Sequence, residues 1–151
     1  MKFQQRQPLP GTREELWPLF ADVEQTALCI PGVESVKASG PDTWAGGMKV
    51  RVGPVGVNMD GTVTLRERDD KGYRLVIALD ARDQRMGAAI QGVLTVSLGE
   101  TQNGRTPLVV DADMNLLGKL AGLGQSIIRI KADDTLKKFA QNLGKRAGGG
   151  S

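Results

Sequence analysis

Histidine is missing from this chain of 151 residues, and cysteine occurs once, as Cys29. The absence of histidine excludes Ser-His-Asp and Cys-His catalysis, as well as zinc and haem sites built on histidine ligands. A single cysteine cannot form an intramolecular disulfide or a metal site with several cysteine ligands. We therefore predict no catalytic and no metal-binding residues, and we expect Cys29 to be a buried structural residue because no base is present to activate it.

Charge and hydropathy exclude two further classes of protein. The 20 basic and 17 acidic residues leave a net charge of +3, which is too small for nucleic-acid binding through phosphate neutralisation. No run approaches the roughly 18 apolar residues of a membrane-spanning helix, and the first ten residues lack the apolar core of a signal peptide. We expect a cytoplasmic protein with one domain over 1–146. Residues 147–151 are expected to be a flexible tail, because their glycines and serine resemble an added linker.

Two helix-capping signals follow a weak strand predicted over 2–9. Thr12 with Glu15 three residues later has the spacing of a capping box, and Asp22 with Gln25 repeats the signal. Each is followed by a short apolar segment, so the sequence predicts two short helices in succession.

From residue 33 the hydrophobic period changes to two, which is typical of strands. Over 55–66 every second residue is apolar or glycine and the residues between them are mostly polar, as expected for a half-buried antiparallel strand. Asn103-Gly104 is a strong hairpin signal before the last strand. The same alternation places four carboxylates on the outer face of the sheet: Asp60, Asp80, Asp111 and Asp113.

From Leu117 the period becomes helical and predicts a helix of about seven turns that ends at Gly144. Gly118, Gly122 and Gly124 would then lie in its first turns. A sheet with one apolar face needs a cover, and this helix supplies it. The fold class is therefore α+β: a curved antiparallel sheet of about seven strands wrapped around a long C-terminal helix, with two short helices after the first strand.

Four segments resemble a known family. They are Glu15-Leu16-Trp17 with Asp22, Cys29-Ile30-Pro31-Gly32, Val50-Arg51-Val52-Gly53-Pro54-Val55, and Gly118-Lys119-Leu120-Ala121-Gly122-Leu123-Gly124-Gln125. With the order of elements, they resemble the helix-grip (Bet v 1/START-like, SRPBCC) superfamily and, within it, the CoxG-like proteins of carbon monoxide dehydrogenase. The resemblance implies a non-catalytic accessory protein of molybdenum hydroxylases of the carbon monoxide dehydrogenase type. Such a protein would help to mature the enzyme or couple it to the membrane, at the inner face of the cell membrane.

The inner face is almost wholly aliphatic, and aromatic residues make up only 4% of the chain. We expect a cavity between sheet and helix that binds a neutral apolar molecule, since an unpaired buried charge would be costly there. An isoprenoid quinone, bound non-covalently, is the hypothesis for this ligand. The residues predicted to bind it are Ile30, Met48, Val50, Met59, Val63, Leu75, Ile77, Ile90, Leu94, Met114, Leu117, Leu120, Gly124, Ile127 and Ile128.

Two surface segments are candidates for contacts with partners. Arg82, Arg85 and Met86 are predicted to form a portal and partner contact beside the cavity. A cluster of cations near the end of the long helix is a candidate for contact with anionic lipid or an acidic partner, or for an ordinary cation-rich helix terminus; it comprises Lys137, Lys138, Lys145 and Arg146.

Three alternatives stay open at this point. The inner face can be a packed core without a cavity. The protein can then be an assembly or maturation factor that needs no ligand. A hydrolase or cyclase acting in the same cavity would need an ionisable side chain that points inward, against the alternation described above.

Overall fold

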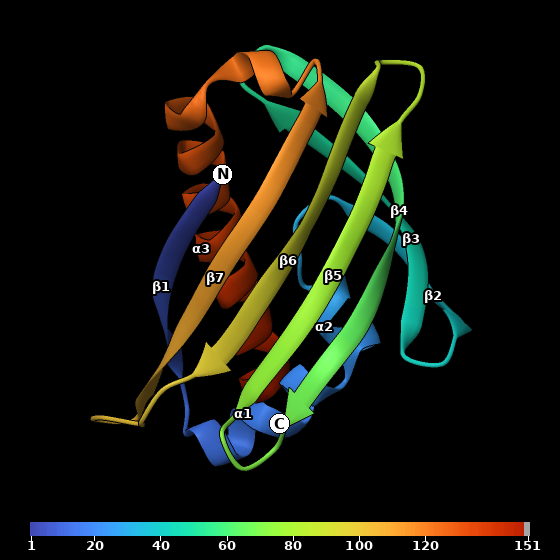
Figure 1. Ribbon diagram of the computed structural model, residues 1–151. Helices are drawn as coiled ribbons and strands as arrows, with labels where there is room; N and C mark the ends of the chain where they lie inside the picture. The colour runs from blue at the N-terminus through green and yellow to red at the C-terminus, as the bar shows by residue number, and fades with distance from the viewer. Residues whose placement is uncertain (150–151) are drawn as a thin grey trace.

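Seven antiparallel strands form one sheet in the order β1-β7-β6-β5-β4-β3-β2 (Figure 1). The computed structural model describes residues 1–149. All strand pairs except β1–β7 join sequence neighbours, so the sheet is a meander to which the first strand is added at the edge. The strands are β1 (Lys2–Pro10), β2 (Val33–Gly40), β3 (Thr43–Val52), β4 (Val55–Asp69), β5 (Arg74–Asp83), β6 (Ala88–Leu98) and β7 (Arg105–Gly118).

The two short helices lie where the capping signals predicted them. Helix α1 (Arg13–Ala21) begins after Thr12, whose hydroxyl accepts a hydrogen bond from the Glu15 N–H at 3.2 Å. Helix α2 (Val23–Leu28) begins after Asp22, whose carboxylate accepts from the Gln25 N–H at 3.2 Å. Each cap satisfies a backbone donor that the first helical turn leaves free. The predicted fold class, including the seven strands and both short helices, is confirmed.

The long helix begins later than predicted. Strand β7 continues through Gly118, a single 3-10 turn (Ala121–Leu123) follows, and α3 spans Gln125–Gly149. The reason is backbone conformation: Gly118 has φ +65° and Gly124 has φ +84°, and neither conformation continues a right-handed helix. The three glycines expected in the first turns of the helix therefore lie before it.

The same helix also ends later than predicted. Gly144 lies inside α3, where the helix passes Pro10 of β1: a Cβ at Gly144 would meet the Pro10 Cγ at 3.1 Å. Residues 147–149 of the predicted flexible tail are helical. Residues 150–151 of that tail lie outside the described residues.

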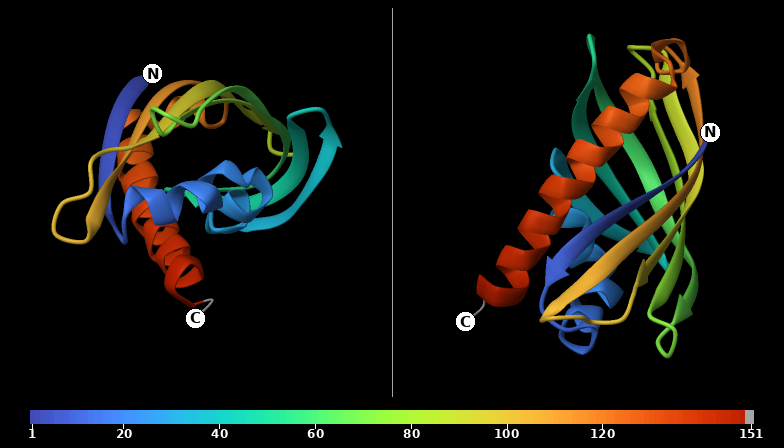
Figure 2. Two further views of the ribbon diagram at one scale, coloured as in Figure 1. Left: turned by 90° about the horizontal axis from the view of Figure 1, so that it is seen from below. Right: turned by 90° about the vertical axis from the view of Figure 1, so that its left-hand side faces the viewer.

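The sheet curves into a half-barrel around α3 (Figure 2). Neighbouring strands lie close together at Gly61 of β4, where a Cβ would overlap the Asp80 carbonyl oxygen of β5. A register shift between Leu65 and Glu67 adds a bulge to the same pair of strands, and bulges and glycine kinks are the usual means of sheet curvature. Helix α3 has most of its contacts with β1 and fewer with β3 and α1.

The apolar interior is divided into two clusters of buried residues. The lower cluster joins α1, the C-terminal half of α3 and the lower ends of the strands; its fully buried members include Leu9, Leu16, Leu75, Leu108 and Leu143. The upper cluster lies under the start of α3 and comprises Val52, Val57, Met59, Ala81, Ala88 and Leu120. The lower cluster contains all the large buried aromatic rings, Trp17, Phe20 and Phe139.

Polar contacts hold α1 against the β4–β5 turn at the lower end of the half-barrel. The Trp17 indole N–H donates to the Asp70 carboxylate at 2.9 Å, and the Arg68 guanidinium donates to the same oxygen at 2.7 Å. These hydrogen bonds hold the pKa of Asp70 below its usual range, with Arg68 the larger cause and Trp17 the second. The Arg13 guanidinium lies 4.4 Å from the Tyr73 ring centre. These contacts join α1 to the β4–β5 turn.

A candidate apolar ligand site between the sheet and the long helix

Between the two clusters the inner face of the sheet is incompletely covered. Val63, Leu94 and Met114, which we call the mid-sheet residues, point to the inner face on β4, β6 and β7, yet each is only half-buried. None of them belongs to either cluster or packs against one. Met48 on β3 is likewise half-buried and outside both clusters. The aliphatic surface is thus continuous across the sheet but is not closed over at its middle.

A pocket of about 250 Å³ opens at the upper end of this surface, between the end of β7 and the start of α3. Its apolar lining includes Met114, Leu116, Leu120 and Ile128. The pocket is also lined by Met1, Asn115, Ala121 and Gln125, which sequence reasoning missed. For Ala121 and Gln125 the reason is that the helical period predicts the start of α3 too early. Four of the predicted ligand-binding residues line the pocket, namely Met114, Leu120, Gly124 and Ile128.

Nine of the other eleven predicted residues divide into three groups. Leu75 is fully buried in the lower cluster, and Ile30 and Ile77 pack against it, so these three belong to packed core. Met59 is a member of the upper cluster, against which Val50 and Ile90 pack. Met48, Val63 and Leu94 remain half-buried and outside both clusters, as described above.

Leu117 does not lie inside. It falls on the odd-numbered, outer side of β7, opposite Ala89 of β6, and is 45% exposed. The prediction for this residue was wrong because the strand extends to Gly118, so the period there is two and not 3.6. Ile127, at the start of α3, is 37% exposed and lies near Gly53 of the β3–β4 turn.

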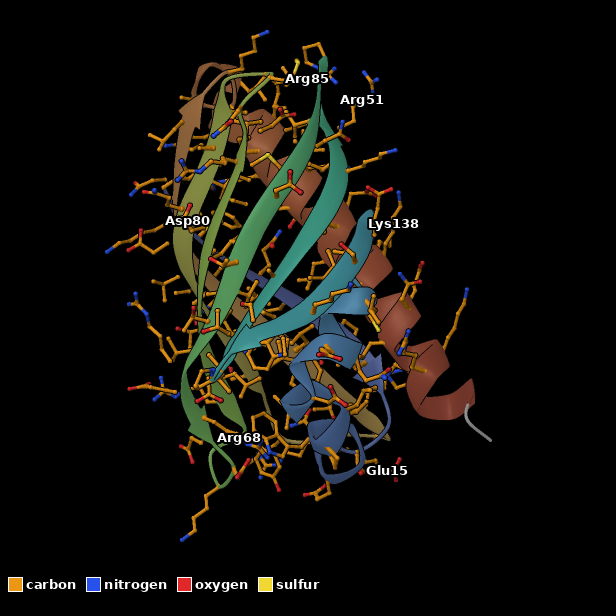
Figure 3. All side chains as sticks on the ribbon, turned by 90° about the vertical axis from the view of Figure 1, so that its right-hand side faces the viewer. Glu15, Arg51, Arg68, Asp80, Arg85 and Lys138 are labelled. Carbon is orange, nitrogen blue, oxygen red and sulfur yellow. The ribbon has the colours of Figure 1, made fainter. Side chains whose placement is uncertain are left out.

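Four carboxylates lie on the outer face, where the alternation placed them. Asp60 and Asp80 are exposed, and Figure 3 shows Asp80 pointing away from the helix side. Asp111 accepts from the Gln4 amide at 2.8 Å, and Asp113 lies 4.0 Å from the Lys2 ammonium group. None of these four provides the inward acid or base that a hydrolase or cyclase would need.

One acidic residue on the inner-face register was missed. Asp83 ends β5 and is only 7% exposed; its carboxylate accepts from the Asn58 N–H at 2.8 Å and from the Met86 N–H at 3.1 Å. The hydrogen bond from Asn58 is the main reason that the pKa of this carboxyl is below its usual range. Asp83 continues the alternation of Leu79 and Ala81 and was missed because the polar sequence around it predicts a loop. Its bonds shape the β5–β6 turn, and it is satisfied without a ligand.

The predicted portal residues occupy that turn. Arg82 and Arg85 are exposed, whereas Met86 is half-buried and packs against the upper cluster. The two arginines line a groove of about 740 Å³ on the outer face of β4 and β5. The other residues of this groove are Asn58, Asp60, Gly61, Thr62, Asp80, Asp83 and Gln84. The arginines therefore lie on the opposite side of the sheet from the pocket, while Met86 faces the interior.

Cys29 is a structural residue, as predicted. It is 1% exposed and belongs to the lower cluster. Burial raises the pKa of its thiol, an effect that the nearby Arg146 partly offsets. A thiol with a raised pKa carries little thiolate at neutral pH and is a poor nucleophile.

Comparison with known families decides the affiliation of the chain. The family model for CoxG, the G component of carbon monoxide dehydrogenase, matches residues 9–148. The chain belongs to the CoxG family. A search of curated proteins gave no significant match. The resemblance that the four sequence segments indicated is thereby confirmed over nearly the whole chain.

Solved structures with the same fold are numerous. A conserved protein from Geobacillus kaustophilus superposes with a TM-score of 0.87 at 18% identity, covering 99% of this chain and 96% of that one. A START superfamily protein from Mycobacterium smegmatis gives a TM-score of 0.71 at 11% identity, with 99% of both chains covered. The ZhuI aromatase/cyclase from Streptomyces sp. R1128 gives 0.62 at 16% identity, covering 97% of this chain and 93% of that one. At these identities the likeness shows the helix-grip fold alone.

Membership of the CoxG family indicates an accessory role for carbon monoxide dehydrogenase. No helix within residues 1–149 combines the length and the apolar character needed to cross a membrane.

Proposed function

We propose that this CoxG-family protein is a non-catalytic accessory protein that binds an elongated apolar molecule between the sheet and α3, and thereby couples a molybdenum-containing carbon monoxide dehydrogenase to the membrane. The observation that carries the proposal is the half-buried state of the mid-sheet residues, Val63, Leu94 and Met114, between two packed clusters. Aliphatic side chains that remain uncovered inside a fold gain stability when an apolar ligand covers them.

The chemistry of the lining favours a neutral ligand. Four side chains of the lining, Met114, Leu116, Leu120 and Ile128, are uncharged, and the flexible thioether of Met114 can adapt to an irregular shape. The amides of Asn115 and Gln125, also in the lining, can donate or accept hydrogen bonds. An isoprenoid quinone fits this arrangement, because it combines a long apolar tail with a head group that carries two carbonyl acceptors. It would supply two-electron redox chemistry, while the chain itself supplies only binding and orientation.

Mass spectrometry of organic extracts tests this proposal directly. Protein purified from its native host should release a quinone or another isoprenoid in near-stoichiometric amount. Stripped protein should take up decylubiquinone from detergent solution. An empty extract together with no uptake would contradict the proposal and leave the ligand-free maturation factor as the better account.

A matched pair of variants locates the site. Val63→Trp places a large ring on the inner face of β4 and should block uptake. Thr62→Trp places the same ring one residue away on the exposed outer face and should bind ligand normally. Equal uptake by the two variants would mean that the ligand lies elsewhere.

A further inference from the structure

Trp44 lies on the inner face of β3, beside the uncovered middle of the sheet. It points to the same side of the strand as Met48 and Val52, and it is paired with Val63, one of the mid-sheet residues. Trp44 is half-buried, and it neither belongs to one of the two clusters nor packs against one. A large aromatic side chain therefore remains uncovered inside the fold.

The ring and the indole N–H of Trp44 both lack partners, in contrast to those of Trp17. The Trp17 ring lies 5.6 Å from the Tyr73 ring, centre to centre, and its N–H donates to Asp70. Within residues 1–149 the Trp44 ring has no aromatic neighbour and its N–H donates no hydrogen bond. No buried side-chain donor in the same range lacks a partner, so the Trp44 N–H is open to the space beside the sheet. A tryptophan in an apolar interior usually finds a partner for this group.

One row of inward-facing residues connects Trp44 with the pocket. The strand register places a residue of each strand opposite one of the next, from β3 across to β7 (Figure 1). The row consists of Trp44, Val63, Leu79, Gly92 and Met114. Four strand spacings of about 4.8 Å separate its ends, or roughly 19 Å along the sheet. Met114 lines the pocket between β7 and α3, so the row runs from that pocket to the indole.

Next to Trp44 the inner face of the sheet carries no side chains. The following inward positions on β3 and β4 are Gly46 and Gly61, which are paired with each other. At each of them a Cβ would overlap a backbone carbonyl oxygen of the adjacent strand, so neither position accepts a larger residue. Met48 lies beyond them, about 14 Å from Trp44 along the strand. An indole and a thioether thus flank a strip of bare backbone, which we call the glycine strip.

We infer that the glycine strip is a subsite for a flat conjugated ring, and that Trp44 is the residue that selects such a ring. An indole contacts other rings favourably face to edge or in offset stacks, and methionine sulfur does so at ring edges. Glycine allows a ligand to approach the backbone closely. The indole N–H donates to a carbonyl oxygen on the ring. A chain attached to the ring then follows the row toward Met114 and the pocket.

The amides of the pocket are the competing partners for a ring carbonyl. Asn115 and Gln125 are exposed, so a ligand must displace water from them and gains little. The Trp44 N–H lies on an apolar face, where a hydrogen bond is stronger. The ring is therefore the innermost part of the bound molecule. This inference rests on the proposed function, because the ring-bearing molecule is the ligand proposed there.

Tryptophan fluorescence tests the position of the ring, because a quinone quenches an indole that it contacts. The chain has two tryptophans, so Trp17→Phe leaves Trp44 as the reporter and Trp44→Phe leaves Trp17. Saturating decylubiquinone should quench most of the emission of the Trp17→Phe protein and little of that of the Trp44→Phe protein. Equal quenching in the two variants, or quenching of Trp17 alone, would overturn the inference.

A pair of ligands tests the selectivity, with decylubiquinone as the ring-bearing ligand and 1-dodecanol as a chain without a ring. Trp44→Leu keeps an apolar side chain but removes the ring contact and the N–H. By calorimetric titration it should raise the Kd of decylubiquinone about tenfold and leave that of dodecanol nearly unchanged. Trp17→Phe replaces a tryptophan outside the row and should keep both affinities. Equal weakening of both ligands by Trp44→Leu would show that Trp44 only packs, and would overturn the inference.

Uptake of decylubiquinone, measured by organic extraction, reports on the proposed function alone. Normal uptake without quenching of Trp44 would remove the ring subsite and leave the carrier, with the ring held at the pocket amides. Menadione, a quinone ring without a chain, separates the opposite case. If decylubiquinone is not taken up but menadione quenches Trp44 saturably, the ring subsite stands and the proposed carrier function falls.

Discussion

Truncating Leu75 in the packed core should lower the free energy of unfolding far more than truncating Leu94 at the middle of the sheet. Leu75 and Leu94 lie on the inner faces of the adjacent strands β5 and β6. Leu75 is 1% exposed inside the lower cluster, whereas Leu94 is half-buried and lies outside both clusters. The two Leu→Ala variants therefore compare a close-packed site with an uncovered one while the chemical change stays the same.

The magnitudes follow from transfer and cavity terms. Leu75→Ala removes buried methyl groups and leaves a cavity, which costs about 3–4 kcal/mol. Leu94→Ala loses only part of the transfer term and creates no enclosed cavity, because its surroundings are already open, so it should cost about 1 kcal/mol. For a chain of this length the difference corresponds to a gap of roughly 5–10 °C in Tm.

Urea denaturation of protein stripped of bound ligand measures both free energies of unfolding. The m-values should agree, so that the midpoints can be compared directly. Equal costs of about 3 kcal/mol for the two variants would refute the reasoning, since the mid-sheet layer would then be packed as tightly as the core.

Three further changes test the supporting structure. Thr106→Val should cost about 1–3 kcal/mol by urea denaturation, because the buried Thr106 hydroxyl donates to the Gly11 carbonyl at 2.8 Å and this bond joins β7 to the start of α1; an unchanged midpoint would contradict this. Gly118→Ala should cost at least about 2 kcal/mol, since φ is +65° and a Cβ would overlap the Gly87 carbonyl; a Gly122→Ala control, with no atom within 4 Å of the added Cβ, should be nearly silent. Asp83 has a lowered pKa in the folded state, so its contribution to stability is complete above its unfolded pKa of about 3.9 and is lost as the pH falls through the folded value. Asp83→Asn should therefore lose less stability in acid than the unaltered chain, as measured by urea midpoints from about pH 6 down to about pH 2. Identical pH profiles of the two proteins would contradict this role of Asp83.

Strands and helix caps were predictable because their signals are local. The alternation over 55–66 indicates a strand with one buried face, whatever element covers that face. The caps at Thr12 and Asp22 each join a side chain to a backbone N–H three residues away. The start of α3 was not predictable from periodicity, because apolar residues between 117 and 124 fit a helical spacing although the chain there completes a strand and a turn. What decides it is the backbone of Gly118 and Gly124, which both have positive φ values. Gly118 lies against the Gly87 carbonyl of the β5–β6 turn, a contact far away in sequence.

The sequence predicts which residues face the inside of the sheet, but not which of them are packed and which are left uncovered. Sequence alternation gives the aliphatic inner face, including Val63, Leu94 and Met114, because side-chain direction in a strand is local. Which parts of that face are packed depends on where α3 crosses the sheet, and α3 leans on β1 and leaves the central strands with few contacts. Leu75 and Ile77 belong to the same alternating stripes as the uncovered residues but are packed core, because α1 and the C-terminal half of α3 cover the lower end of the sheet.

Methyl NMR of stripped protein during titration with decylubiquinone tests the central claim most directly. The account predicts that the methyl resonances of Val63, Leu94 and Met114 shift in a saturable manner, whereas those of Leu9 and Leu108, fully buried in the lower cluster, stay in place. Shifts confined to surface methyls, or no saturable shift at any mid-sheet residue, would contradict a ligand site between the sheet and α3.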